Sequence, residues 1–367
     1  MVPELAEERA RLVELEMQIL EAERTLAALR LQELVARARL NAYKYPVLTL
    51  PDEIIAEMFL HFVPEYPKCS PVAGPRSPMR LTHVCRLWRA IALAAPRLWR
   101  ALSLPFRSSS SLDNLWLSRA GSLPLAICLQ ESDGDTPDFP AHVTALLPYL
   151  PQALCEYLEI GLASRVSDLP LIKSDFPILK HLDLSLSDIR PHGIELFNVP
   201  MLRSVVVEIH ATHGIALPWT QLDTLSLYDI TLSNCEDVLR QVTNLLHLNL
   251  ELFVDDDAHD FVIEPAINLP YLKSFKADGE RNMKRLLDSF VLPSLLQLDV
   301  AEDYLGKDPI ASLTTFILRS GCKLEKLYVT YADSLSNTPY LPTFASVEEV
   351  HVLLGSWPDR SHLHLLS

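Results

Sequence analysis

Two clusters of acidic and histidine side chains have the chemistry of a metal site. The run Asp255–Asp257 is followed by His259 and Asp260, and His210 and His213 lie close together further upstream. Carboxylates and imidazoles are common metal ligands, but the glycine and the ligand spacing of a calcium loop are missing around the aspartates. A solvated loop and a strand end explain the two clusters more simply, so we expect no metal and no cofactor.

The cysteines and glycines argue against an enzyme. The six cysteines are far apart and form no C-x-x-C sequence, so neither a disulfide framework nor a structural zinc site is predicted. The chain has only ten glycines and lacks a G-x-S-x-G turn, a glycine-rich phosphate loop and an H-E-x-x-H helix. We therefore expect reduced, buried thiols and no catalytic activity.

Charge is distributed unevenly along the chain. The net charge at pH 7 is −15, yet the segment from Lys68 to Arg107 contains eight basic residues and no acidic one. The overall negative charge argues against binding of a nucleic-acid backbone by the whole molecule. We expect no nucleic acid as a partner, although a nucleic-acid binder that uses this basic segment is one hypothesis for the function. The segment is instead expected to face an acidic partner.

Length and hydropathy indicate an intracellular globular protein. The chain has 367 residues, of which 49% are hydrophobic, enough for two or three structural units with a buried core. Polar residues interrupt the longest apolar run, so no membrane span is predicted. The acidic N-terminus lacks the apolar core of a signal peptide. We expect a cytoplasmic and/or nuclear protein.

Residues 3–40 are expected to form one long helix, because they contain no glycine, one proline at the start and many helix-forming residues. Apolar residues recur every seven positions, and a second row follows three positions after the first. The two rows are Leu5, Leu12, Ile19, Leu26 and Leu40, and Leu15, Ala22, Leu29 and Ala36. This is the a/d pattern of a coiled coil, interrupted by Glu33. Further apolar residues widen the stripe, so a homodimer through residues 3–40 and a helix packed on its own chain both stay open.

A second helical unit follows. Thr49 is expected to cap a helix whose apolar residues keep helical spacing as far as Phe62. Five prolines then make residues 63–80 a loop. Another helix is expected over 80–94, because apolar residues again recur on one face.

From about residue 150 the sequence repeats. Each unit has an apolar residue, two variable residues, a second apolar residue, one variable residue and a third apolar residue. The units are Cys155-Leu158-Ile160, Leu179-Leu182-Leu184, Leu202-Val205-Val207, Leu222-Leu225-Leu227, Leu245-Leu248-Leu250, Leu272-Phe275-Ala277, Leu295-Leu298-Val300, Leu324-Leu327-Val329 and Val347-Val350-Val352. The spacing between units, about 24 residues, lies in the range of leucine-rich repeats.

Prolines support this register. In four units a proline lies two residues before the first leucine, where it ends the preceding segment and starts an extended strand. These are Pro177, Pro200, Pro270 and Pro293. We therefore predict an α/β fold, an irregular leucine-rich-repeat solenoid with a parallel sheet on its concave face and helices on its convex face. Convex helices are expected at 232–242 and 282–291.

The segment between the long helix and the repeats resembles an F-box. That family's pattern opens with Leu-Pro-x-Glu and an amphipathic helix, continues with a Val-Cys-x-x-Trp helix and closes on a Leu-Trp pair. The matching residues are Leu50-Pro51-Asp52-Glu53, Val84-Cys85-Arg86-Leu87-Trp88 and Leu98-Trp99. The whole layout is similar to that of a large group of fungal F-box proteins, which join an N-terminal coiled coil, an F-box of three helices and degenerate leucine-rich repeats.

The resemblance implies a substrate-recognition adaptor of an SCF-type (Skp–cullin–F-box) ubiquitin ligase. The F-box would bind the acidic Skp adaptor, which links to the cullin scaffold, and the basic segment fits such a partner. The repeats would hold a protein substrate close to the ubiquitin-conjugating enzyme. The residues that match the expected adaptor contacts are Leu50, Pro51, Ile54, Ile55, Val84, Cys85, Trp88 and Trp99.

The proline-rich insertion departs from the family pattern. F-box helices are usually joined by a short turn, whereas residues 63–80 separate the first two helices here. The expected domains are a coiled-coil helix over 1–41, the F-box over 46–104 and the leucine-rich-repeat domain over 105–367.

The variable residues between the repeat leucines should face outward and contact the substrate. Those with the strongest polar or charged character are Asp183, Arg203, Asp223, Ser226, His247, Asn249, Lys273, Lys276, Gln297 and Tyr328. They mix both charges and identify no particular substrate. The alternative function is a non-ligase leucine-rich-repeat scaffold that self-associates through the coiled coil. Co-purification with the Skp adaptor separates these two hypotheses.

Overall fold

The computed structural model of the protein describes residues 2–43, 45–105, 116–130, 154–162, 172–186, 194–208, 215–253, 262–279, 285–332 and 340–353. The chain divides into two compact units, Met1–Met58 and Phe59–Ser367, and each is described by itself. This division falls within the helix expected after Thr49. The three expected domains, 1–41, 46–104 and 105–367, stay a prediction.

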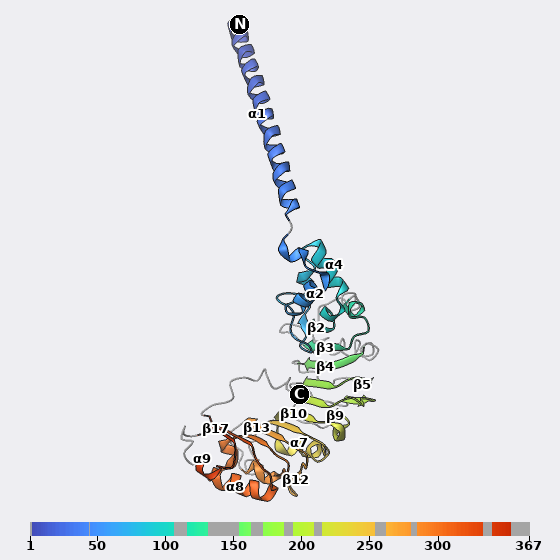
Figure 1. The fold of residues 1–367 in the computed structure, drawn as a ribbon, viewed down its shortest axis with the longest axis vertical. Helices are drawn as coiled ribbons and strands as arrows, with labels where there is room; N and C mark the ends of the chain where they lie inside the picture. Colours follow the sequence, from blue (N-terminus) through green and yellow to red (C-terminus); the bar gives the residue numbers. More distant parts are fainter. Residues whose placement is uncertain are drawn as a thin grey trace. The chain divides into compact units, whose positions relative to one another are not determined.

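The N-terminal unit consists mainly of one long helix, α1 (Val2–Ala42), drawn in blue in Figure 1. The helix predicted over 3–40 is therefore confirmed. A short 3-10 helix, η1 (Pro46–Thr49), precedes α2 (Asp52–Leu60). The predicted N-cap role of Thr49 is wrong, because Thr49 ends η1 and its hydroxyl donates to the carbonyl of Pro46 at 2.7 Å.

The second unit is built on one sheet of twelve strands, all paired in parallel (Figure 1). In spatial order the strands are β1 (Ser70–Pro71), β2 (Ala101–Pro105), β3 (Leu125–Gln130), β4 (Cys155–Leu162), β6 (His181–Leu186), β8 (Ser204–Glu208), β10 (Thr224–Ile230), β11 (His247–Leu252), β13 (Ser274–Gly279), β15 (Gln297–Ala301), β16 (Lys326–Thr330) and β17 (Glu349–Val352). This is a solenoid-like α/β arrangement.

The nine repeat units supply the strands from β4 to β17. Their apolar residues lie opposite one another: Leu158 pairs with Leu182 and Ile160 with Leu184, and the same register continues to Val329 and Val352. Because side chains alternate along a strand, these residues share one face, which is buried, while the intervening residues form the other face. The predicted strands and their register are confirmed.

A tight turn before the strand accounts for the prolines. The N–H of Leu202 donates to the carbonyl of Val199 at 3.1 Å, and Pro200 occupies the second position of this turn, where its fixed φ is favourable. The same bond precedes three further strands, from Leu179 to Phe176, from Leu272 to Leu269 and from Leu295 to Leu292. The prolines therefore stabilise the turn that precedes each of these four strands.

Three strands precede the repeats in the sheet. β1 lies within the predicted insertion and β2 within the predicted F-box, so the sheet begins earlier in the chain than residue 105. The single helix predicted over 80–94 is divided into α3 (Pro78–Leu81) and α4 (Arg86–Ala94), followed by η2 (Pro96–Leu98). The division arises because Cys85 has an extended backbone and its Sγ caps α4 by accepting the N–H of Trp88 at 3.4 Å.

The connections between sheet strands are more varied than the predicted convex helices. α7 (Leu232–Leu239) lies where a helix was expected over 232–242. The helix predicted over 282–291 is wrong in its described part, which holds η6 (Leu286–Ser289) and β14 (Phe290–Val291). The other connecting elements are β5 (Ile172–Asp175), β7 (Ile194–Phe197), β9 (Ile215–Ala216), η5 (Trp219–Gln221), β12 (Ile267–Asn268), η7 (Glu302–Leu305), α8 (Pro309–Ser320) and α9 (Tyr340–Thr343). β5, β7 and β9 form one small parallel sheet, and β12 and β14 form another.

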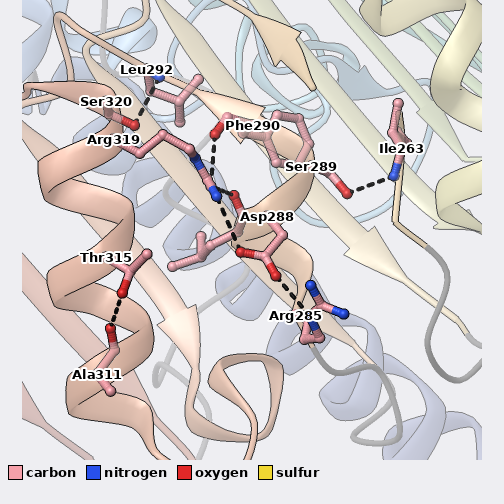
Figure 2. A network of polar contacts seen from close by, with 11 residues as sticks. Ile263, Arg285, Asp288, Ser289, Phe290, Leu292, Ala311, Thr315, Arg319 and Ser320 are labelled. Carbon is pink, nitrogen blue, oxygen red and sulfur yellow. Dashed lines mark hydrogen bonds and ion pairs between the residues drawn. The ribbon is translucent and has the colours of Figure 1, made fainter. Parts of the chain in front are cut away.

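A polar network joins the end of α8 to the preceding connection, as Figure 2 shows. The Arg319 guanidinium lies 3.2 Å from the carboxylate of Asp288 and donates to the carbonyls of Leu287 and Phe290 at 2.5 and 3.1 Å. The hydroxyl of Ser320 accepts the N–H of Leu292 at 3.2 Å. These bonds tie the end of α8 to η6, β14 and the residue that follows β14.

Candidate functional site

Helix α2 carries apolar side chains on two faces. Ile55 and Phe59 are buried, with exposed fractions of 1% and 2%, whereas Ile54 and Met58 are 50% and 47% exposed. Residues four apart lie above one another on a helix, so each pair forms a short stripe. Leu50, just before the helix, is also exposed. One stripe of α2 therefore remains uncovered.

The α3–α4 segment of the second unit exposes a further apolar side chain. Val84 lies between the two helices and is 59% exposed. Its position is fixed from both sides, because Cys85 caps α4 and the Arg89 side chain donates to the carbonyl of Thr82 at 2.7 Å. Val84 is therefore held outward by a short, hydrogen-bonded connection.

Four of the eight predicted adaptor contacts are buried or half-buried. Ile55 and Trp99 are buried. The Trp99 indole N–H donates to the carbonyl of Ala92 at 2.8 Å, and its ring packs edge-on against Trp116 at 4.9 Å between centroids. Trp88 is half-buried and packs on Phe59 at 4.9 Å. Among the eight predicted residues, Leu50, Pro51, Ile54 and Val84 are the exposed ones.

Basic side chains accompany the α3–α4 segment. Arg80, Arg86, Arg89 and Arg97 are exposed, as are Lys68 and Arg76 upstream. Arg100 instead stacks on the ring of Tyr66, with its guanidinium carbon 3.6 Å from the ring centroid. In the sequence, exposed basic residues therefore precede and follow Val84.

The second candidate surface is the open face of the large sheet, defined as the face formed by the half-exposed residues of β4 to β17. A hollow of about 290 Å³ lies on its central strands. The residues that line it are Tyr157, His181, Leu182, Asp183, Ser204, Val206, Thr224, Leu225, Ser226, His247, Leu248, Asn249, Ser274, Lys276 and Gln297. Most of them are polar.

Carboxylates gather towards the β4 end of the open face. Glu159 of β4 lies opposite Asp183 of β6, and Glu208 of β8 lies opposite Ser185. Glu159 accepts a hydrogen bond from the Gln130 side chain at 2.6 Å, and Ser185 donates to Glu208 at 2.8 Å. Lys276 of β13 lies on the other side of the hollow, beside Asn249. The open face is therefore acidic towards its β4 end, whereas on the other side of the hollow Lys276 lies opposite Asp299 of β15.

Burial and neighbouring charges shift the pKa values of three side chains on the open face. Burial, together with the charges of Glu159 and Glu208, raises the pKa of Asp183 to about 7. Burial lowers the pKa of His181, and burial and Lys273 lower the pKa of His247. Both histidines are therefore predominantly neutral at pH 7, and Asp183 titrates near that pH.

The structure brings most of the predicted substrate contacts together on the open face. Six of the ten line the hollow, and Tyr328 lies further along on β16. Arg203, Asp223 and Lys273 each immediately precede a strand. The carbonyl of each accepts two N–H groups from the next repeat, as Arg203 does from Asp223 and Thr224. These three residues thus also hold neighbouring repeats in register.

Sequence reasoning missed two carboxylates of the acidic end. Glu159 lies between Leu158 and Ile160, the same variable position that Asp183 occupies in the next unit. Extending the rule to the first repeat would have found it. Glu208 directly follows the last apolar residue of its unit and had no comparable signal.

The described part of the chain contains no group of three metal-binding side chains. The clusters around Asp255–Asp257 and at His210 and His213 lie outside the described residues. All six cysteines are free thiols. A search of the described helices found none long and apolar enough to cross a membrane.

Comparison with known proteins adds no family assignment, because no family model matches the chain and no curated protein matches it.

Proposed function

We propose that the protein is a substrate-recognition adaptor of an SCF-type ubiquitin ligase, with an F-box that binds the Skp adaptor and leucine-rich repeats that bind a protein substrate. The observation that carries the proposal is the exposed stripe Ile54–Met58 on α2, in a helix whose other apolar stripe is buried. An uncovered apolar stripe on a folded helix marks a surface for a partner.

The chemistry around the F-box motif supports an acidic partner. Val84 belongs to the Val-Cys-x-x-Trp motif and is exposed beside Arg80 and Arg86. Apolar contacts at the centre of an interface supply affinity, while surrounding charges steer association. The acidic Skp adaptor expected from the F-box resemblance fits both requirements.

The open face supports a protein substrate over a small molecule. Its hollow is broad, is lined by residues from several strands and has carboxylates towards its β4 end. An extended or helical segment of a protein can span such a surface, with basic side chains of its own against the acidic end. The adaptor's role is then to hold that substrate close to the conjugating enzyme.

The test is co-purification of the full chain with the Skp adaptor, compared among three proteins. Val84→Asp places a carboxylate in the proposed interface at an exposed position, so the fold should persist and adaptor binding should fall about tenfold or more. Leu318→Asp makes the same kind of change at an exposed leucine of α8, which is 78% exposed, and should leave binding unchanged. Circular dichroism checks that both variants are folded.

The outcomes separate the proposal from its alternative. Binding by the parent and by Leu318→Asp, with loss in Val84→Asp, supports the adaptor function. Failure of a folded parent to bind the Skp adaptor contradicts it and leaves the repeat scaffold that self-associates through its N-terminal helix.

A further inference from the structure

Helix α1 presents an apolar surface that its own side chains leave open to solvent. Every residue from Leu5 to Ala42 is exposed, and thirteen of them are large apolar side chains. Leu12, Ile19 and Leu26 are 57%, 58% and 48% exposed. Helices gain most of their stability from packing of an apolar face, so this surface requires a partner.

The spacing of the apolar residues specifies a partner helix with the same repeat. Leu12, Ile19 and Leu26 occupy a positions, and Leu15 and Leu29 occupy d positions, of a seven-residue repeat. A strict seven-residue repeat keeps its seam against a neighbour only in a left-handed coiled coil, where each layer needs a matching layer on the other helix. A second copy of α1 offers matching apolar layers from Leu12 to Leu29, the part of the seam between Glu8 and Glu33.

We propose that α1 pairs with α1 of a second copy of the chain in a parallel, in-register coiled coil. Such pairing does not depend on the adaptor function. In a parallel pair a g residue of one helix meets the e residue five positions further along the other. Arg11 is a g residue and Glu16 the matching e residue, so the two helices attract at two symmetry-related places. The remaining g residues in the middle of the helix are Gln18, Thr25 and Gln32, which repel nothing.

The charges disfavour the antiparallel arrangement. With full overlap, an antiparallel pair sets the column of e residues against itself in reverse order. That column is acidic in the middle, at Glu16 and Glu23, and basic towards both ends, at Arg9 and Arg30. Acidic residues would meet acidic ones and basic residues basic ones. The parallel pair avoids this repulsion.

Single cysteines in the full-length protein test both the pairing and its direction. In the parallel pair two copies of Leu12→Cys meet in one layer, and mild oxidation should give a disulfide-linked dimer that reductant dissolves. In an antiparallel pair the position-12 layer faces position 29, so crosslinks would form only when Leu12→Cys chains are mixed with size-tagged Leu29→Cys chains. The parent, with its native thiols, gives the background. Self-crosslinking of Leu12→Cys supports the proposal, whereas crosslinking of the mixture alone overturns it.

A charge series tests the contact that sets the direction, with dissociation followed by light scattering. Arg11→Glu should weaken the dimer about fivefold or more, because two attractions become repulsions. Adding Glu16→Arg should restore it, since the pair is then re-formed with the charges exchanged. Arg24→Glu makes the same charge change at an f position, which faces away from the seam, and should have no effect. A parent that stays monomeric at tens of micromolar, or a charge series without rescue, overturns the proposal.

Discussion

Asp183 lies between two other carboxylates on the open face, and its pKa is raised to about 7 by burial and by Glu159 and Glu208. An aspartate in an unfolded chain titrates near pH 4. Between about pH 4 and 7 the folded state therefore holds the proton more tightly than the unfolded state, and this residue makes the protein less stable as pH rises through that window.

Asp183→Asn should remove this pH dependence. At pH 8 the variant should be more stable than the parent by on the order of 2 kcal/mol, because the parent then keeps a buried charge beside two like charges. At pH 4 the two should differ little. Urea unfolding at both pH values measures the free energy, with Asp237→Asn, at an exposed position of α7, as the control. An equal gain at both pH values would show that ionisation of Asp183 is not the source of the instability.

Gly279 is a residue at which only glycine fits. Its φ is +128°, and a Cβ added there would lie 2.0 Å from the carbonyl oxygen of Leu252 on the neighbouring strand. Residues with a side chain rarely adopt such a φ, and the added Cβ would meet backbone atoms that cannot move aside.

Gly279→Ala should therefore lower the free energy of unfolding by about 3 kcal/mol or more. Gly321→Ala is the matched control, because Gly321 also has a positive φ, +67°, but open space around its Cβ position. Its cost should be about 1 kcal/mol, from strain alone. Denaturant unfolding of both variants measures the difference, and equal costs would show that the contact with Leu252 is not responsible.

Arg319 joins two elements, α8 and the η6–β14 connection, through one side chain (Figure 2). Arg319→Met keeps much of the apolar stem but leaves two carbonyls and Asp288 without this donor. We expect a loss of about 1–3 kcal/mol in the free energy of unfolding. Arg319→Lys should recover only part of it, because an ammonium group cannot reproduce the planar fork. Lys323→Met, at an exposed position nearby, should change the stability little in the same urea titration.

At the scale of helices and strands, an element could be predicted where its own residues carried a recognisable pattern. The strands β6 and β8 were predictable because buried and half-exposed residues alternate along them after a proline turn. β1 was not, since its two residues lie among prolines that indicate a loop. The break between α3 and α4 depends on a cysteine that acts as a helix cap, a role usually taken by serine, threonine, aspartate or asparagine.

The candidate surfaces were predictable to different degrees. The open face follows from strand alternation, so residues such as Asn249 and Lys276 could be placed on it. The burial of Ile55 and Trp99 depends on tertiary packing, and a family motif does not separate core positions from contact positions. Their role as adaptor contacts stays a prediction.

At the scale of the whole molecule, the large sheet should differ in stability along its length. Each inner strand is bonded to two neighbours, whereas β1 and β17 are bonded to one. In repeat folds stability comes mainly from contacts between adjacent units, and openings start where such contacts are fewest. The amides of β10, β11 and β13 should therefore exchange with deuterium at least about tenfold more slowly than those of β17. Peptide-level hydrogen exchange on the full chain measures this, and equal protection of β11 and β17 would contradict it.

Because β1 and β2 belong to the same sheet as the repeats, the number of strands fixes the distance between the start of the second unit and each repeat. Neighbouring strands lie about 4.8 Å apart, so β10, five places from β2, is about 24 Å away along the sheet. β2 pairs directly with β3 in the hydrogen-bond ladder, and each repeat adds one fixed increment. If the α3–α4 segment is held by the ligase, the number of repeats sets how far from it a captured protein lies, and therefore which of that protein's lysines come within range. Removing one inner repeat would move the point of capture by one increment and change the lysines that receive ubiquitin.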